Sequence, residues 1–209
     1  MEGGENCVLH GDDKSENLLS EIVGAQAYQG QRHMNMETLY EYGSRSGFWR
    51  ILRLFQEMKM AATVYAVGMA LERNPDAAKA MVDAGFEIAS HGYRWIDYQT
   101  VDIETERVHI QQSIEAIVKT TGTRPVGIYQ GKPNKNTRAL IVEEGGFLYD
   151  ADSYSDDLPY WTYWQGPEKG DIRAHLVVPY SLDCNDMRFA QALEGERFFL
   201  FVQGIECIS

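Results

Sequence analysis

The sequence predicts an α/β fold, organised as an incomplete (β/α) barrel. Short, apolar, β-prone segments alternate along the chain with amphipathic segments of helical period. Clear signals separate them, such as Asn74-Pro75, which is typical of a helix start, and Gly122, which is typical of a helix end. Strands that alternate with helices form βα units, and several units in succession favour a parallel sheet of barrel type.

The first half of the chain contains two such units. A helix capped by Ser44 is expected over 44–59, with one apolar face, and a strand over 61–67 follows it. The expected face consists of Phe48, Ile51, Leu52 and Phe55. Asn74 and Pro75 then start a helix that ends near Gly85, and a strand over 86–90 leads directly to His91.

The second half repeats this cycle. A helix is expected over 102–121 and another over 136–144, the second capped by Asn136 and stopped by Gly145-Gly146. The buried side chains expected on the longer helix are Val108, Ile114, Ile117 and Val118. Three further strands are expected at 125–129, 147–149 and 175–178.

Composition excludes several classes of partner. The net charge of −12 repels a polyanion and no basic stripe offsets it, so no nucleic-acid partner is expected. No apolar run approaches the ~20 residues of a membrane span, and the acidic start does not resemble a secretory signal, so no membrane association is expected. The three cysteines, Cys7, Cys184 and Cys207, lack CxxC spacing and predict a reducing, cytoplasmic setting.

Chemistry in such a barrel sits on loops that follow the strands. His91 directly follows a predicted strand, where it could bind a metal or transfer protons, although a hydrogen-bonded structural histidine is the alternative. Tyr129 and Lys132 follow the next strand and could stabilise an oxyanion. The segment 149–161 crowds four aspartates with aromatic residues, which indicates either a substrate pocket or a solvated acidic turn. Glu2 beside Gly3-Gly4 could act as a base or metal ligand, or belong to a frayed terminus.

Together these segments resemble the NodB-homology, or polysaccharide deacetylase, superfamily and especially its allantoinase-like branch. The motifs that carry the resemblance are Tyr40 to Arg50, Glu87-Ile88-Ala89-Ser90-His91-Gly92, Arg124-Pro125, Tyr149 to Trp161 and Val178 to Phe189. The resemblance implies a partial catalytic domain over 1–190 and a divergent tail over 191–209. It also implies that the first strand, and the last barrel strands with a further histidine, lie beyond the two ends of this chain.

One departure from the family pattern favours the allantoinase-like branch. Deacetylases of the superfamily use an Asp-Asp pair and a His-x-x-x-His motif to hold a divalent metal, whereas Trp95 stands four residues after His91. Tryptophan cannot ligate a metal. The resemblance therefore implies a metal-independent hydrolase of non-peptide C–N bonds that opens a small cyclic amide such as allantoin. No cofactor and no metal ligand are expected, and zinc is expected only for a deacetylase.

The resemblance also implies roles for individual residues. His91 is expected to transfer protons, and Glu2 to orient water or substrate. Substrate contacts are expected from Trp95, Asp152, Asp157, Tyr160, Trp161, Tyr129 and Arg45. The alternatives are a polysaccharide or chitin deacetylase that removes N-acetyl groups, and an inactive, shortened homologue. Open strand edges make a homo-oligomer possible.

Overall fold

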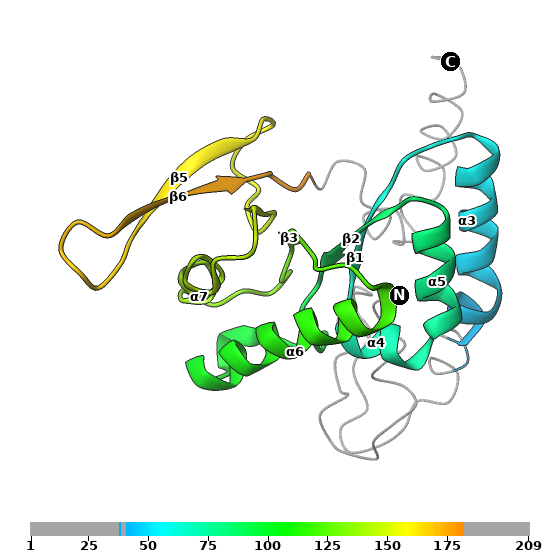
Figure 1. Cartoon of the computed structure of the whole chain (residues 1–209), viewed down its shortest axis with the longest axis horizontal. Coiled ribbons are helices and arrows are strands. Elements are labelled where there is room, and N and C mark those ends of the chain that lie inside the picture. The colour runs from blue at the N-terminus through cyan, green and yellow to red at the C-terminus, as the bar shows by residue number, and fades with distance from the viewer. Residues whose placement is uncertain (1–37, 39–40, 182–209) are drawn as a thin grey trace, which may run out of the picture.

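The computed structural model describes residue 38 and residues 41–181 (Figure 1). The helical elements are η1 (Gly43–Gly47, a π-helical turn), α3 (Phe48–Glu57), α4 (Gly68–Arg73), α5 (Pro75–Asp83), η2 (Tyr98–Thr100, a 3-10 turn), α6 (Ile103–Thr121) and α7 (Thr137–Glu144). The strands are β1 (Thr63–Ala66), β2 (Glu87–Ser90), β3 (Gly127–Ile128), β4 (Tyr149–Asp150), β5 (Tyr160–Gln165) and β6 (Ile172–Val177). The chain therefore alternates strands and helices as far as β4.

These six strands form one sheet in the order β1-β2-β3-β4-β6-β5. The pairs β1–β2, β2–β3, β3–β4 and β4–β6 are parallel, which confirms the predicted α/β class. One row of partners crosses the parallel strands near their carboxyl ends: Ala66, Ser90, Ile128, Asp150 and Val177. The residues that follow this row, including His91 and Tyr129, therefore leave the sheet at the same edge.

Local capping explains where two of the helices begin and end. The Asn74 side chain accepts a hydrogen bond from the Ala77 N–H, and the Asp102 side chain accepts one from the Thr105 N–H. Gly122 ends α6 in the left-handed conformation at φ 75°. Asn136 is the N-cap residue of α7, as predicted, but its side chain makes no capping hydrogen bond. Instead, the Asn134 side chain accepts a hydrogen bond from the Asn136 N–H at 2.6 Å.

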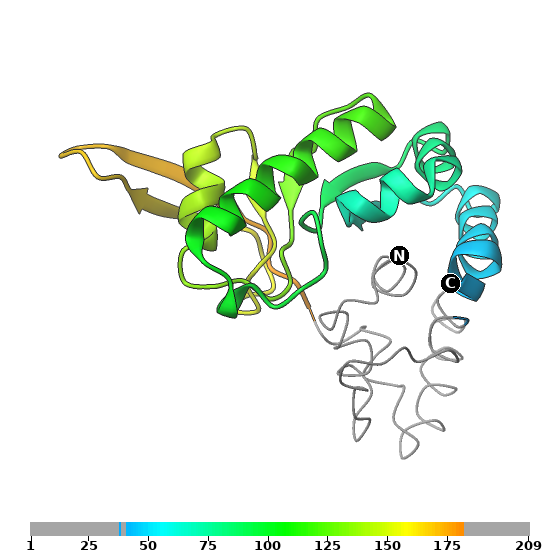
Figure 2. The ribbon, with the colours of Figure 1, turned by 90° about the horizontal axis from the view of Figure 1, so that it is seen from below.

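The core has two main clusters, and helix α6 contributes to both. The first contains Ile110, Ile114, Ile128, Leu140, Ile141 and Phe147. The second contains Ala66, Leu71, Ala78, Met81 and Ile117. Helix α6 also contacts α4, α5, α7 and β2, and Figure 2 shows it lying across the described elements.

Several side chains expected in the core are exposed. Ile51 on α3 is 59% exposed, and Val108 and Val118 on α6 also face solvent, whereas Leu52, Ile114 and Ile117 are buried as predicted. The buried face of α6 is rotated from the expected one, because Ile110, Ser113 and Ala116 also face the core. A helix pattern with apolar residues on two faces does not specify which face is covered.

Helix α4 and strand β5 were not predicted, nor was the short turn η2. Helix α4 follows β1 directly, where no helix was expected. Strand β5 begins at the end of the segment 149–161 and continues to Gln165, where no strand was expected. It pairs with β6 in an antiparallel hairpin that projects from the rest of the described structure (Figure 1). This hairpin departs from the all-parallel sheet that was expected.

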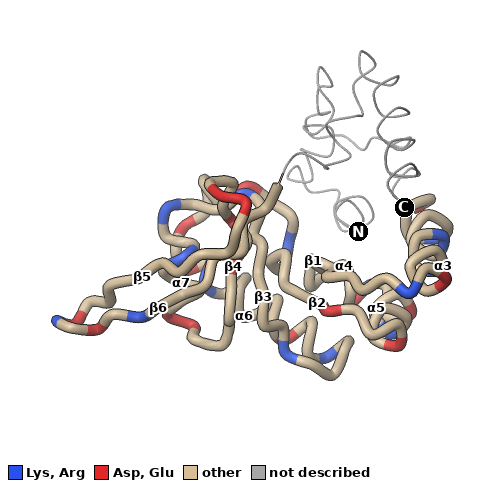
Figure 3. Tube along the Cα trace, turned by 90° about the horizontal axis from the view of Figure 1, so that it is seen from above, with Lys and Arg blue, Asp and Glu red and all other residues tan. Residues whose placement is uncertain are grey.

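Charges of both signs are interspersed along the described chain (Figure 3). Within residue 38 and residues 41–181, no helix is both long and apolar enough to cross a membrane.

Candidate active site

His91 lies at the carboxyl edge of the sheet, immediately after β2. Its backbone N–H donates to the Ala66 carbonyl at 2.9 Å, and its side chain is buried at 2% exposure. The ring Nδ1 forms a hydrogen bond with the backbone carbonyl of Tyr129. A carbonyl oxygen can only accept, so Nδ1 carries the proton, and in the neutral ring Nε2 is the basic nitrogen. The backbone thus selects the tautomer that a proton-transfer role needs.

Aromatic rings fix the plane of His91. The His91 ring stacks on the Tyr129 ring with centroids 5.2 Å apart and planes 4° apart. Tyr129 in turn stacks on Tyr180, at 4.7 Å and 1°, and its hydroxyl contacts the Tyr154 hydroxyl at 2.8 Å. Burial is the main cause that raises the pKa of Tyr129, so its hydroxyl stays protonated. Tyr129, predicted as a substrate contact, is therefore part of the support of His91.

Asp152 bridges the loops that follow β3 and β4. Its Oδ2 accepts from the Gln130 N–H at 2.7 Å, and its Oδ1 accepts from the Gly131 N–H at 2.8 Å. Burial raises the pKa of Asp152 to about 6, although these two N–H groups and the nearby His91 act in the opposite direction. The charge of His91 therefore influences the Asp152 carboxyl, which gains or loses its proton at about pH 6.

Asp150 forms a second, fully buried charge centre. Arg138 donates from Nε and Nη2 to its two oxygens at 2.8 and 3.0 Å, and His175 Nε2 donates at 3.0 Å. Burial alone would raise the pKa of Asp150, but the hydrogen bonds from His175 and Arg138 outweigh it and lower that pKa. The network joins α7, β4 and β6, and Arg138 also donates to the Asp152 carbonyl at 3.3 Å.

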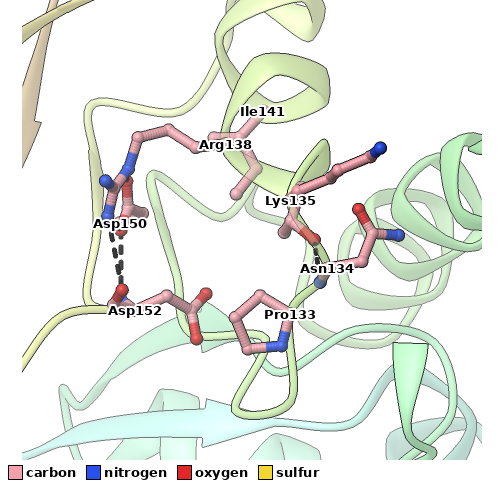
Figure 4. Close-up of a pocket in the computed structure, with 8 residues that line it drawn as sticks. Pro133, Asn134, Lys135, Arg138, Ile141, Asp150 and Asp152 are labelled. Carbon is pink, nitrogen blue, oxygen red and sulfur yellow. Dashed lines mark hydrogen bonds and ion pairs between the residues drawn. The ribbon is translucent and has the colours of Figure 1, made fainter. Parts of the chain in front are cut away.

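A cavity of about 160 Å³ lies beside these carboxylates, at the start of α7. Its lining residues are Pro133, Asn134, Lys135, Thr137, Arg138, Ile141, Asp150 and Asp152. Figure 4 shows the Asp152 carboxyl group near the Pro133 ring and the Arg138 side chain turned toward Asp150. The loop that forms one wall is tied to α6, because buried Glu106 accepts hydrogen bonds from Asn134 and Thr137.

The other predicted substrate contacts lie at varying distances from this centre. Trp95 is buried in a small cluster with Val67 and Ala70, and the Lys132 ammonium lies 4.4 Å from its ring centroid. Arg45 lies in η1, exposed, and pairs with Glu41 at 3.1 Å. No described contact links it to His91 or Asp152. Glu2 lies outside the described residues.

Only some of the predicted contact residues in the acidic segment 149–161 lie near the site. Tyr160 accepts or donates hydrogen bonds with Ser153 and Ser155, at 3.0 and 3.1 Å. Trp161 is 62% exposed on β5, and Asp157 is exposed in the turn before that strand. Asp152 binds the backbone next to Tyr129, and Tyr154 contacts the Tyr129 hydroxyl, so these two members of the segment lie nearest to the support of His91.

Several residues of the site were not predicted as such. Gly131 was not singled out, although a Cβ there would lie 2.8 Å from His91 Cε1. Gln130 was missed too, yet it directly follows a predicted strand end, and the rule that selected Tyr129 could have found it. No local signal identifies Arg138 or His175, because their partner Asp150 is distant in sequence.

Comparisons with known proteins place this site in a family. The family model described as polysaccharide deacetylase matches residues 33–145. The chain belongs to the polysaccharide deacetylase family. A Schizosaccharomyces pombe protein named as a candidate polysaccharide deacetylase is 40% identical over 203 residues, which are 91% of this chain and 63% of that protein. The chain thus spans less than two thirds of that relative.

Two solved structures are more similar. A candidate polysaccharide deacetylase from Pseudomonas aeruginosa is 54% identical, with a TM-score of 0.84, over 99% of this chain and 69% of that one. The PuuE allantoinase is 52% identical, with a TM-score of 0.84, over 99% of this chain and 68% of that one. The resemblance to the NodB-type barrel is therefore confirmed.

A metal centre of the deacetylase type does not fit the described residues. Trp95 occupies the position four residues after His91, and an indole has no lone pair for a metal. Within residue 38 and residues 41–181, no group of three His, Cys, Asp or Glu side chains could hold an ion. The described contacts of the His91 ring include the Tyr129 carbonyl and the Tyr129 ring, neither of which is a metal ligand of the deacetylase type.

Proposed function

We propose that this protein is a C–N hydrolase that opens a small cyclic amide, with allantoin as the leading substrate. The proposal rests on one observation at the position of the second histidine of the metal-binding motif. That position holds Trp95, which is packed in the core and cannot ligate a metal. The similarity to the PuuE allantoinase, at 52% identity over nearly the whole chain, supports the same substrate class. A cytoplasmic location is part of the proposal, because three cysteines without CxxC spacing suit a reducing compartment.

In this proposal His91 transfers the proton. Its Nε2 removes a proton from the attacking water as oxygen bonds to the ring carbonyl carbon, and the C–N bond breaks as the proton passes to the leaving nitrogen. The Tyr129 carbonyl holds the Nδ1–H throughout, so the ring keeps its orientation while it is protonated and deprotonated. Asp152, in its charged form, accepts a hydrogen bond from a substrate N–H.

The other predicted contacts have supporting roles in the same proposal. Trp95 and Lys132 form a wall near the η2 turn, where the indole is fixed by packing and by the cation over its face. Tyr160, Trp161, Asp157 and Arg45 are proposed as outer contacts, and Glu2 as the group that orients water. No cofactor is proposed.

A second candidate function is deacetylation of an N-acetylated polysaccharide. The names of the Schizosaccharomyces pombe and Pseudomonas aeruginosa relatives favour it. This reaction would need metal ligands from beyond the described residues.

One assay separates the two candidates. The purified chain is incubated with allantoin and, separately, with an N-acetylglucosamine oligomer, each with and without a metal chelator. The proposal expects allantoate from allantoin at a rate that the chelator leaves unchanged. Acetate release from the oligomer that the chelator abolishes and zinc restores would establish the second candidate.

A further inference from the structure

Gln130 occupies a central position that the proposed mechanism does not use. It follows Tyr129 on the loop after β3, and its backbone N–H donates to Asp152. Its side chain is only 2% exposed. In sequence, the residue therefore lies between Tyr129, which supports His91, and Gly131, where an added Cβ would meet the His91 ring.

The Gln130 carboxamide is buried without a hydrogen-bond partner. Neither Oε1 nor Nε2 has one within the part of the chain that the structure describes. Native proteins leave few buried polar groups unpaired, because each has lost its water without compensation. A methionine of similar size would fill the same space without this cost, so the amide is unexplained by folding.

Two glycines make room for this side chain and for His91. Gly92 has φ 74°, and a Cβ there would lie 3.2 Å from Gln130 Oε1 and 3.3 Å from Nε2. Gly131 has φ 79°, and its Cβ would press on the His91 ring. The amide therefore lies against the backbone of the residue that follows His91.

We propose that Gln130 is a specificity-determining residue whose carboxamide pairs with an N–H and an adjacent C=O of the substrate. The inference rests on the proposed function and narrows it to substrates with a free amide edge. A carboxamide presents a coplanar donor and acceptor, which match the acceptor and donor of such an edge. Among the described residues no hydrogen bond holds the amide in place, so substrate can draw it into a new rotamer without breaking one.

The test is a binding measurement on the full chain by isothermal titration calorimetry. The probes are hydantoin, which has free N–H groups beside its carbonyls, and 1,3-dimethylhydantoin, in which both N–H groups are blocked. The wild type is expected to bind hydantoin roughly 10- to 100-fold more tightly, as expected for the loss of one or two hydrogen bonds. Gln130→Met is expected to bind the two probes with nearly equal affinity. Gln99→Met, the same change at an exposed position, is expected to keep the preference.

Thermal melting of the same variants completes the test. Gln130→Met is expected to melt at or above the wild-type temperature, because it removes an unpaired polar group. A lower melting temperature would show that the amide serves the fold, for instance through a buried water, and would overturn the inference. So would a wild type without preference, or a Gln130→Met variant that keeps it.

The outcomes also separate this inference from the proposed function. Preference for hydantoin without turnover of allantoin would support the role of Gln130 and count against the proposed reaction. Turnover of allantoin that Gln130→Met leaves unchanged would support the reaction and remove Gln130 from it.

Discussion

Tyr129 holds the side chain of His91 in two ways at once. Its backbone carbonyl accepts from His91 Nδ1, and its ring stacks on the imidazole with planes 4° apart. The first contact sets the tautomer and the second sets the plane of the ring. Both contacts come from the residue that directly follows the neighbouring strand β3, so the orientation of His91 depends on the β2–β3 register, in which Ser90 pairs with Ile128.

Substitutions at Tyr129 should distinguish the contribution of its ring from that of its hydroxyl. Tyr129→Phe loses only the contact with the Tyr154 hydroxyl and is expected to keep kcat within about tenfold of the wild type. Tyr129→Leu keeps the carbonyl but loses the stack, and its kcat is expected to fall roughly 100-fold as His91 becomes misoriented. Steady-state kinetics on allantoin measure both. Equal losses in the two variants would instead place the hydroxyl in the reaction.

Gly131→Ala should impair activity through His91. The added Cβ would lie 2.8 Å from His91 Cε1, so the ring must move. A loss of kcat on the order of 100-fold is expected, as for other small displacements of catalytic groups. Gly122→Ala is the matched control, because Gly122 has a similar positive φ of 75° but no atom within 4 Å of its Cβ. Both variants should lose about 1 kcal/mol of stability, and only the first should lose activity. Similar activities for the two would refute the contact with His91.

The buried ion pair of Asp150 should dominate local stability. Asp150→Ala removes the partner of Arg138 and His175 and is expected to lower the free energy of unfolding by about 3–5 kcal/mol. Asp83→Ala removes an exposed pair with Lys79 and is expected to cost less than about 1 kcal/mol. Denaturant unfolding of both variants provides the comparison. A small effect at Asp150 would mean that its network contributes little to the fold.

Activity should depend on the charge of Asp152. The pKa of this carboxyl is raised to about 6, so the group is charged above pH 6 and largely neutral well below it. Because the charged form is proposed to accept from a substrate N–H, kcat/KM should rise with pH through about 6. Asp152→Asn should lower kcat/KM and remove this part of the pH profile. If the variant keeps the rise of kcat/KM near pH 6, another group is responsible for that rise.

The same pKa predicts how stability changes with pH. A carboxyl whose folded pKa lies above its unfolded value binds protons more tightly in the folded state. Its contribution therefore favours folding at low pH and is lost as the pH rises from about 4 to about 6. The melting temperature of the wild type should fall relative to that of Asp152→Asn across this interval. A difference that stays constant with pH would contradict the raised pKa.

Much of the fold follows from local signals in the sequence. Asn74-Pro75, Asp102 and Gly122 correctly mark helix ends, because capping depends on neighbours within one turn. The position of His91 follows from the strand before it. Strand β5 was missed because its residues, Tyr160 to Gln165, do not alternate between apolar and polar types and gain their order from pairing with β6.

The residues that support the site are harder to predict from local sequence patterns. Arg138 and His175 approach Asp150 from a helix and from a strand that are distant in sequence, so their partner is visible only in the fold. The burial of Gln130 depends likewise on Gly92, which is 38 positions earlier in the chain. Tertiary packing determines these contacts and this burial, and a local sequence pattern does not indicate them.

The central claim, that His91 transfers the proton in the opening of a cyclic amide, is tested most directly by turnover of allantoin. The wild type and His91→Ala are compared at neutral pH in the presence of a metal chelator, with circular dichroism to establish that both are folded. Allantoate formation by the wild type and its loss in the folded variant are the predicted result. Equal rates in the two proteins, or turnover that stops when metal is removed, would contradict the account.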